Sequence, residues 1–576
     1  MSVARSYPIF LWGASTSSYQ VEGGITNNDW DFFTRSDSIK KRIASLTKPN
    51  LLYKDSTQVH LQPAGDAARA WDPHYYQNDF ELAKKMGMNA FRIGVEWARI
   101  EPEKDQWDQE AIDHYKQMVR SMTEAGLTPV ITLNHLTLPL WVLTPPSKFT
   151  KRIGQGLLPS PLRDLPLADP PASDPYWKSL RGWENKETVK EFIEYVVKVV
   201  EELRDQVDYW VTIGEPVASV IGAGYIAGLW PPGFLLDGNR ARNVLHNLID
   251  AHVQAYDKIS LLDNIDADGN GLSKMVGFSH AMIAVSPAEP SNTLRATINN
   301  NQEAAKNFDY FINDYFINAV VNGEEDLNYL DTLQRYNKDS SNFIIHQRWK
   351  NKTDFIGIDY YRRVYVNYSN ILSLSSAKFV GGSLINNLHS QTHNQSHGIL
   401  NDFGWEIYPE GLYNLIMRIK NQWRSTLPVF ILENGVADKS DRYRAPFIVA
   451  HLQQVKRAIS SGAKIIGYLH WSFMDNYEWL ESYRPEAKFG LFSIDRSKVK
   501  GGQLDFRRQK TKGAEALELI MKGSPSQDKS EIISDSAIVE AENKFGTFTS
   551  DGMHLVPYKS GNVPWSADAS EGSHSP

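Results

Sequence analysis

Residues 90–135 read AFRIGVEWARIEPEKDQWDQEAIDHYKQMVRSMTEAGLTPVITLNH, and this stretch decides the fold class. Two short β-rich runs, at 90–97 and 128–135, flank a segment at 108–125 with helical periodicity. Strand-like runs that alternate with helical segments are typical of parallel strands joined by a crossover helix. The stretch therefore predicts one strand–helix–strand unit.

The same alternation recurs along the chain. Further strands are predicted at 8–15, 209–216, 274–281, 355–361, 428–435 and 465–472. Further helices are predicted at 74–87, 184–204, 241–260, 298–320, 409–422 and 444–461. One helical face of the 184–204 segment carries Phe192, Tyr195, Val196, Val199, Val200 and Leu203. Eight strands alternating with helices favour an α/β fold, a single (β/α)8 TIM barrel. A doubly wound open sheet is disfavoured because no G-x-G-x-x-G follows the first strand and no phosphate loop occurs.

Composition limits the classes of function. Of the 576 residues, 41% are hydrophobic and 22% are charged, as in ordinary globular proteins. A net charge of −7 without a basic block gives no reason to expect a nucleic acid or a membrane surface as partner. The absence of cysteine excludes disulfides, iron–sulfur clusters, thiolate zinc sites and a cysteine nucleophile. Without a signal-peptide layout or a membrane-length apolar run, a cytoplasmic enzyme is expected.

Long interruptions separate some of the predicted elements. They lie at 36–65, 142–183, 229–240 and 362–400, and three of them follow strands. Loops after strands lie at the C-terminal face of a barrel, where binding sites form. From 522 onward the chain is rich in Ser, Asp, Glu, Gly and Pro with little periodicity. We therefore predict a barrel domain at 1–521 and a polar tail at 522–576, either disordered or draped over the barrel.

Most of the predicted strands end in polar or aromatic side chains. The endings are Ser15 to Gln20, Arg92 to Trp97, Asn134-His135, Glu215, Asp359-Tyr360-Tyr361, Glu433-Asn434 and His470-Trp471. Because these ends meet at one rim of a barrel, a single pocket of carboxylates, amides and aromatic rings is expected. Its residues show no metal-ligand spacing, and we predict neither metal nor cofactor. The chain has 16 Trp, 26 Tyr and 24 Phe, and flat rings in polar surroundings suit sugar binding.

Glu215 and Glu433 are the candidate catalytic pair. Two carboxylates flanking a glycosidic oxygen are the minimum for hydrolysis of a glycoside. Each follows an apolar strand and precedes a residue that redirects the chain, Pro216 or Asn434-Gly435. Spacing alone leaves open that either Glu is only a polar strand end, because their meeting depends on the barrel.

Ordered motifs from Phe10 to about Asp495 resemble those of glycoside hydrolase family 1. They are FLWGASTSSYQVEG (10–23), GDAARAWDPHYYQNDFELAKKMGMNAFRIGVEWARIEP (65–102), TLNHLTLPLW (132–141), WVTIGEP (210–216), DFIGIDYY (354–361), DFGWEIYPEGL (402–412), ILENG (431–435) and GYLHWSFMDNYEWLESYRPEAKFGLFSID (467–495). The DFGW and YPEGL motifs, and YYRR in place of YYT, resemble the archaeal branch of that family.

The resemblance implies roles for individual residues. Glu215 would be the acid/base and Glu433 the nucleophile, which Arg92 would pair with and Tyr361 would hydrogen-bond. The implied sugar-binding residues are Gln20, His135, Trp471, Glu478 and Trp479, with Trp405 as a platform beside the leaving group.

The implied activity is that of a retaining, exo-acting β-glycosidase. It would hydrolyse β-glucosides, β-galactosides or related sugars by double displacement, with a small-molecule β-glycoside as its partner. Glu478 disfavours phosphorylated sugars, because a carboxylate accepts from hydroxyls and repels phosphate. Homo-oligomerisation is left open.

Three positions depart from the family pattern. Gly214 stands where an Asn precedes the acid/base, Leu136 replaces a Trp after the histidine, and Asp359 replaces an Asn before the two tyrosines. The missing Asn would hold the sugar 2-hydroxyl, a contact that strengthens at the transition state. We hypothesise either a relocated contact through Asp359 or tolerance of 2-acetamido and 2-deoxy groups. The alternative is that Gly214 arose by neutral drift, in an enzyme whose substrates do not need the 2-hydroxyl contact.

Two other functions are compatible with the same motifs. A transglycosidase would form the same covalent intermediate and pass the sugar to another alcohol. A sugar-binding protein without catalysis is supported only by Gly214, and the presence of both Glu215 and Glu433 argues against it.

Overall fold

A computed structural model describes residues 9–46, 61–143, 179–234, 237–289, 295–326, 343–366, 398–423, 426–496, 499–500, 503–524 and 531–557. Expectations for parts of the long interruptions, at 47–60, 144–178 and 367–397, lie outside the described residues. The same holds for 525–530 and 558–576 of the predicted tail.

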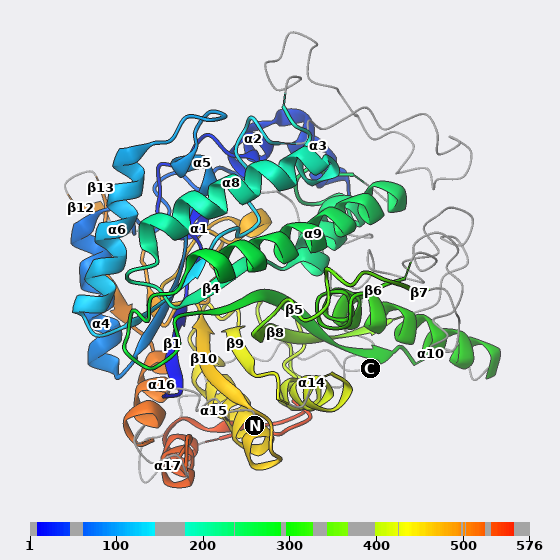
Figure 1. The fold of residues 1–576 in the computed structure, drawn as a ribbon. Helices are drawn as coiled ribbons and strands as arrows, with labels where there is room; N and C mark the ends of the chain where they lie inside the picture. Colours follow the sequence, from blue (N-terminus) through cyan, green and yellow to red (C-terminus); the bar gives the residue numbers. More distant parts are fainter. Residues whose placement is uncertain are drawn as a thin grey trace.

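Eight parallel strands close into a barrel, as predicted. The strands are β1 (Leu11–Ser15), β2 (Ala90–Gly94), β3 (Thr128–Thr132), β4 (Tyr209–Gly214), β5 (Met275–Pro287), β8 (Phe355–Val366), β9 (Val429–Asn434) and β10 (Ile465–Trp471). Their order around the barrel is β1-β10-β9-β8-β5-β4-β3-β2. Figure 1 shows the first strand beside the last, and Leu11 to Ser15 pair with Gly467 to Trp471.

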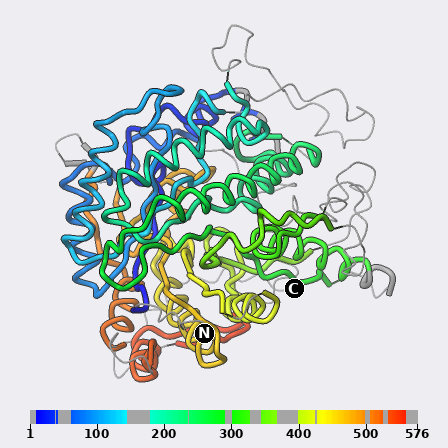
Figure 2. Tube along the Cα trace, in the orientation of Figure 1, coloured from blue at the N-terminus to red at the C-terminus, as the bar shows by residue number. Residues whose placement is uncertain are grey.

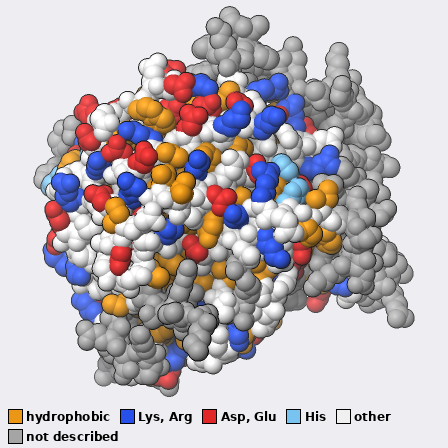
Figure 3. Space-filling view, viewed as in Figure 1, with side chains coloured by type: hydrophobic (Ala, Val, Ile, Leu, Met, Phe, Trp, Pro, Cys, Tyr) orange, Lys and Arg blue, Asp and Glu red, His pale blue; other side chains and the backbone are white. Residues whose placement is uncertain are grey.

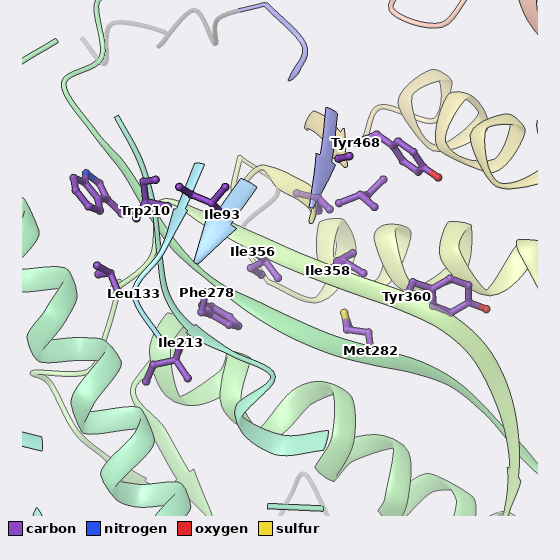
Figure 4. Close-up of a cluster of buried hydrophobic side chains, with 14 of the residues drawn as sticks. Ile93, Leu133, Trp210, Ile213, Phe278, Met282, Ile356, Ile358, Tyr360 and Tyr468 are labelled. Atoms are coloured by element: carbon purple, nitrogen blue, oxygen red, sulfur yellow. The ribbon is translucent and has the colours of Figure 1, made fainter. Parts of the chain in front are cut away.

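Burial on both faces explains why these runs are strands. Apolar residues on both sides of a strand suit a barrel that is filled inside and covered by helices outside. Inward-facing side chains such as Leu11, Val130 and Phe430 form one buried cluster. A larger cluster joins the outer faces of the strands to the helices. Figure 4 shows part of this outer layer around Ile93 and Phe278.

The surrounding helices confirm the predicted helical segments. They are α4 (Pro73–Met86), α6 (Gln109–Glu124), α8 (Lys186–Leu203), α9 (Gly238–Leu262), α10 (Arg295–Asp309), η4 (Tyr310–Asp314), α11 (Tyr315–Asn322), α14 (Pro409–Gln422) and α15 (Arg444–Ser460). The predicted apolar face of α8 is buried throughout. Its first turn is capped by Asn185, whose side chain accepts a hydrogen bond from the backbone N–H of Glu187 at 3.0 Å.

Shorter elements connect and cover the barrel. The helical ones are α1 (Ser18–Val21), α2 (Asp29–Arg35), α3 (Asp37–Leu46), α5 (Trp97–Ile100), η2 (Gly182–Glu184), η3 (Pro216–Ile226), η8 (Trp479–Glu481), α16 (Lys512–Lys522) and α17 (Asp535–Phe545). The short strands pair as hairpins or ribbons: β6 (Glu324–Asp326) with β7 (Phe343–Ile345), β11 (Phe492–Ser493) with β14 (Gln509–Lys510), β12 (Val499–Lys500) with β13 (Gln503–Leu504), and β15 (Thr547–Phe548) with β16 (Leu555–Val556).

Two strands and one helical segment differ from the prediction. β5 and β8 continue to Pro287 and Val366 and stay paired beyond the predicted ends. The segment predicted as one helix at 298–320 consists of α10, α11 and the π-helical turn η4 between them. Within η4, the side chain of Asn313 accepts from the N–H of Ile283 and donates to its carbonyl, both at 2.9 Å. The irregular turn thereby anchors the extended part of β5.

The described part of the chain after 522 contains a helix that the sequence did not predict. Helix α17 buries Ala537, Ile538 and Ala541 and contacts α15 and α16. Strand β15 also contacts α15. Figure 2 shows these orange and red segments beside yellow α15.

The exterior is charged and mixed in sign. Figure 3 shows Lys and Arg side chains interspersed with Asp and Glu on one face of the molecule. Within the described ranges, no helix combines the length and apolar character that crossing a membrane requires.

Candidate active site

The C-terminal ends of the barrel strands surround a cavity of about 230 Å³. All the residues predicted for the site line it except Gln20 and Arg92: His135, Glu215, Asp359, Tyr361, Trp405, Glu433, Trp471, Glu478 and Trp479. Strands β3, β4, β8, β9 and β10 and the segments that follow them supply these side chains. The barrel therefore brings together residues that are widely separated in the sequence.

Glu215 follows directly after β4. Its backbone is left-handed, with φ +43°, a conformation that is uncommon for residues other than glycine. Its N–H donates to the Ser279 carbonyl at 2.9 Å, which ties the turn to β5. The Ser219 hydroxyl donates to the Glu215 carboxylate. Burial, followed by the nearby charge of Glu433, raises the pKa of Glu215 to about 7. At neutral pH this carboxyl can therefore either give or take a proton.

Glu433 receives a hydrogen bond on each carboxylate oxygen. Arg92 Nη1 donates to Oε1 at 2.6 Å, and the Tyr361 hydroxyl donates to Oε2 at 2.5 Å. Thr132 fixes the guanidinium by accepting from Arg92 Nε at 2.8 Å. Burial raises the pKa of Glu433, and Arg92 and Tyr361 oppose that effect. These two donors favour the charged form, in which Glu433 can act as a nucleophile.

Asp359 adds a third carboxyl to the pair. One oxygen each of Glu215, Asp359 and Glu433 lies within 4.8 Å of the others. The Ser279 hydroxyl donates to Asp359 Oδ2 at 2.5 Å, whereas buried Oδ1 has no hydrogen-bond partner among the described residues. Burial and the charge of Glu433 raise the pKa of Asp359 well above its usual range. Asp359 is therefore expected to be protonated beside an ionised Glu433.

Aromatic rings also line the cavity. The His135 ring lies nearly parallel to Trp471, with centroids 5.8 Å apart, and to Trp479, with centroids 6.4 Å apart. Burial, followed by the charge of Arg92, lowers the pKa of His135 well below its usual range, so the ring is neutral. Trp471 Nε1 donates to Glu478 Oε1 at 3.3 Å. Rings, a carboxyl group and a neutral imidazole together suit an uncharged polyhydroxylated ligand.

Gln20 is not among the residues that line this cavity. Its amide group bonds within the protein: Oε1 accepts from the Ser17 hydroxyl at 2.7 Å, and Nε2 donates to the Tyr477 carbonyl at 2.7 Å. The predicted contact between Gln20 and a sugar stays a prediction.

Three further residues contact the carboxyl cluster or line the cavity, and the sequence analysis did not predict them as site residues. Ser219 and Ser279 hold Glu215 and Asp359 by hydrogen bonds, and Arg362 lines the cavity. Ser219 follows Glu215 by four residues, a spacing that could have been recognised from the helical start at Pro216. Ser279 gave no such signal, because its contact with Asp359 depends on the pairing of β5 with β8.

Gly214 and Leu136, which differ from the family pattern, each fit their surroundings. A Cβ atom on Gly214 would make only ordinary contacts, the nearest at 3.4 Å from the Asn134 carbonyl oxygen. Leu136 packs in a cluster with Trp479 and Trp230. The rings of Trp230 and Trp479 lie 5.4 Å apart. Position 214 thus has room for a Cβ atom.

Comparison with known proteins gives a consistent result. The family model "Glycosyl hydrolase family 1" matches residues 5–150 and 177–519. A β-galactosidase of Pyrococcus woesei is 28% identical over 542 residues, which cover 84% of this chain and 92% of that protein. β-Glucosidase A of Thermotoga maritima is 26% identical over 524 residues, covering 87% of this chain and 95% of that protein.

Solved structures agree with these relatives. A β-glycosidase from Pyrococcus horikoshii has a TM-score of 0.64 at 26% identity and covers 92% of this chain and 96% of its own. The β-glycosidase of Thermosphaera aggregans has a TM-score of 0.65 at 25% identity, covering 94% and 99%. Given the match along most of its length and the barrel that carries it, the chain is an O-glycoside hydrolase and belongs to glycosyl hydrolase family 1.

Proposed function

We propose that this protein is a retaining, exo-acting β-glycosidase in which Glu433 is the nucleophile and Glu215 the acid/base. One observation carries the proposal: carboxyl oxygens of Glu215 and Glu433 lie within 4.8 Å of each other in the cavity. Retaining enzymes hold the two carboxyls about 5–5.5 Å apart, whereas inverting enzymes need roughly 6.5–9.5 Å for a water molecule. The substrates proposed are β-glucosides, β-galactosides or related sugars, like those named for the relatives.

In the first step, Glu433 attacks the anomeric carbon while Glu215 protonates the departing oxygen. Arg92 and Tyr361 hold the attacking carboxylate by their two hydrogen bonds. The product is a covalent ester between the sugar and Glu433, together with the free alcohol.

In the second step, Glu215 takes a proton from water, and the water oxygen displaces Glu433 from the anomeric carbon. Ester formation has removed the charge of Glu433, one of the two main causes that raise the pKa of Glu215. The ionised form of Glu215 is therefore more favourable in the intermediate, where a base is needed. Two inversions leave the anomeric configuration unchanged.

Asp359 is the proposed contact for the sugar 2-hydroxyl. Gly214 offers no side chain there, whereas Asp359 lines the cavity with a buried Oδ1 that has no partner among the described residues. A protonated carboxyl can both donate to and accept from a hydroxyl. The alternative is tolerance of 2-deoxy or 2-acetamido sugars in the space beside Gly214.

Turnover of chromogenic aryl β-glycosides tests the function. Wild type should release the aryl alcohol and, by NMR, the β-anomer first, whereas Glu433→Gln should be inactive. An α-anomer as first product would contradict retention, and absence of turnover on every glycoside tried would favour a binding protein. Added alcohol distinguishes the transglycosidase, which would form mainly transfer product rather than free sugar.

A further inference from the structure

Arg362 brings a positive charge into a cavity whose other charges are acidic. Among the described lining residues, the side chains that can carry a negative charge through a carboxyl group are Glu215, Asp359, Glu433, Glu478 and Glu481. Arg362 follows Tyr361 directly on β8, and its guanidinium carbon lies 4.4 Å from the centroid of the Trp405 ring. Burial lowers the pKa of Arg362 to about 10, so it is still a cation at neutral pH.

This guanidinium has no hydrogen bond or ion-pair contact with any residue that the structure describes. Its neighbour Arg363 pairs with Glu406, and Arg92 pairs with Glu433. The chain that follows β8 offers no partner nearby in sequence, since no Asp or Glu occurs between Asp359 and Asp402. A partly buried cation whose N–H groups make no direct hydrogen bond or ion pair is unfavourable, which is a reason to look for a bound anion in a ligand.

The surroundings of Arg362 indicate which part of the substrate would carry that anion. Among the described carboxyls, Glu215 is the one whose charge acts on the pKa of Arg362, and Glu215 is the proposed proton donor to the leaving oxygen. The residues predicted to bind the sugar include His135, whose ring stacks with Trp471 and with Trp479. Because Arg362 also stacks on Trp405, the ring that the family resemblance predicts beside the leaving group, we place Arg362 on the side where the alcohol departs.

We propose that Arg362 is a specificity residue that binds an anionic group, a carboxylate, phosphate or sulfate, on the leaving group of the glycoside. The inference rests on the proposed function. The guanidinium lies over the Trp405 ring, and a planar guanidinium on an aromatic face keeps N–H donors available at its edge. Two of these donors match the two oxygens of such a group.

An anion bound there would also assist the acid. The charge of Arg362 is one of the causes that lower the pKa of Glu215. A bound anion would offset this charge, so Glu215 would keep its proton to higher pH in the complex than in the free enzyme. The alkaline limb of kcat should accordingly lie at higher pH for an anionic leaving group than for a neutral one.

The test compares 3-carboxyphenyl and 3-carbamoylphenyl β-glucosides, which have the same shape and differ in charge. Wild type should prefer the carboxylate by about tenfold in kcat/KM, the effect of one charged hydrogen-bonded contact. Arg362→Met should remove that preference, and Arg362→Lys should keep part of it. Arg348→Met, a matched loss of charge at an exposed arginine paired with Asp250, should leave the ratio unchanged.

Equal rates for the two glucosides in wild type, or an unchanged ratio in Arg362→Met, would overturn the inference. A preference for phenyl β-glucuronide over phenyl β-glucoside that is lost in Arg362→Met would place the anion on the sugar and overturn the leaving-group assignment. Failure of the proposed function looks different, because then neither aryl glucoside would be cleaved by any variant.

Discussion

Asp359 and Glu433 are paired residues on the adjacent strands β8 and β9, and their carboxyl oxygens lie within 4.8 Å of each other. Arg92 donates to Glu433 and to Thr132, while Asp359 receives its hydrogen bond from the neutral hydroxyl of Ser279. Two adjacent buried carboxyls do not readily ionise together. The unequal partners therefore keep the charge on Glu433 and the proton on Asp359.

Asp359→Asn tests this assignment of the proton. An amide resembles a neutral carboxyl in shape and hydrogen bonding, so kcat/KM for aryl glucosides should change by less than about threefold. Asp359→Ala removes the contact and should cost about tenfold or more, as expected for one lost hydrogen bond at the transition state. Measuring kcat/KM of both variants by steady-state kinetics tests whether Asp359 is protonated. Equal losses in the two would show that the charge of Asp359, and not its hydrogen bond, is needed.

The pH dependence should report Glu215. Burial and Glu433 raise its pKa to about 7, and the proton donor is lost as the pH rises through that value. The alkaline limb of kcat/KM for an aryl glucoside with a poor leaving group should therefore lie near pH 7. Glu215→Gln should lose this limb and most of the activity, and a 2,4-dinitrophenyl glucoside, which leaves without protonation, should still form the covalent ester. A limb unchanged in Glu215→Gln would assign it to another group.

Ser219 should set the position of that limb. Its hydroxyl donates to the Glu215 carboxylate and so favours the ionised form. Removing the donor raises the pKa of Glu215, so Ser219→Ala should shift the alkaline limb to higher pH. Ser219→Thr keeps a hydroxyl and serves as the control. A shift to lower pH in Ser219→Ala, or the same shift in both variants, would contradict this role.

The sequence predicted the barrel strands well because most are apolar and buried on both faces, which produces short runs that differ from the helical segments. The ends of β5 and β8 were missed, at 282–287 and 362–366, because there the two strands pair with each other beyond the closed barrel. Helix α17 was missed because its buried face is small: Ala537, Ile538 and Ala541 within a polar stretch.

For the site, the sequence motifs predicted which residues would gather in the cavity. Their spacing along the chain did not predict which of them contact one another across neighbouring strands. The cluster of Glu215, Asp359 and Glu433 depends on the register of β8 against β9 and on closure of the barrel. The unpaired state of Arg362 likewise depends on where neighbouring strands place their carboxyls. The sequence therefore predicted which residues would line the cavity better than it predicted their electrostatic relationships.

Gly214→Asn tests recognition at C2. A Cβ atom fits at 214 with ordinary contacts, so the variant should fold, and its amide should reach toward the sugar 2-hydroxyl as proposed for the family pattern. The contact strengthens at the transition state, so the ratio of kcat/KM for glucoside over 2-deoxyglucoside should rise about tenfold. Gly214→Ala adds the Cβ atom without the amide and should leave the ratio unchanged. If both variants lower kcat/KM equally for the glucoside and the 2-deoxyglucoside, the space beside Gly214 does not face C2. Another residue would then bind the 2-hydroxyl.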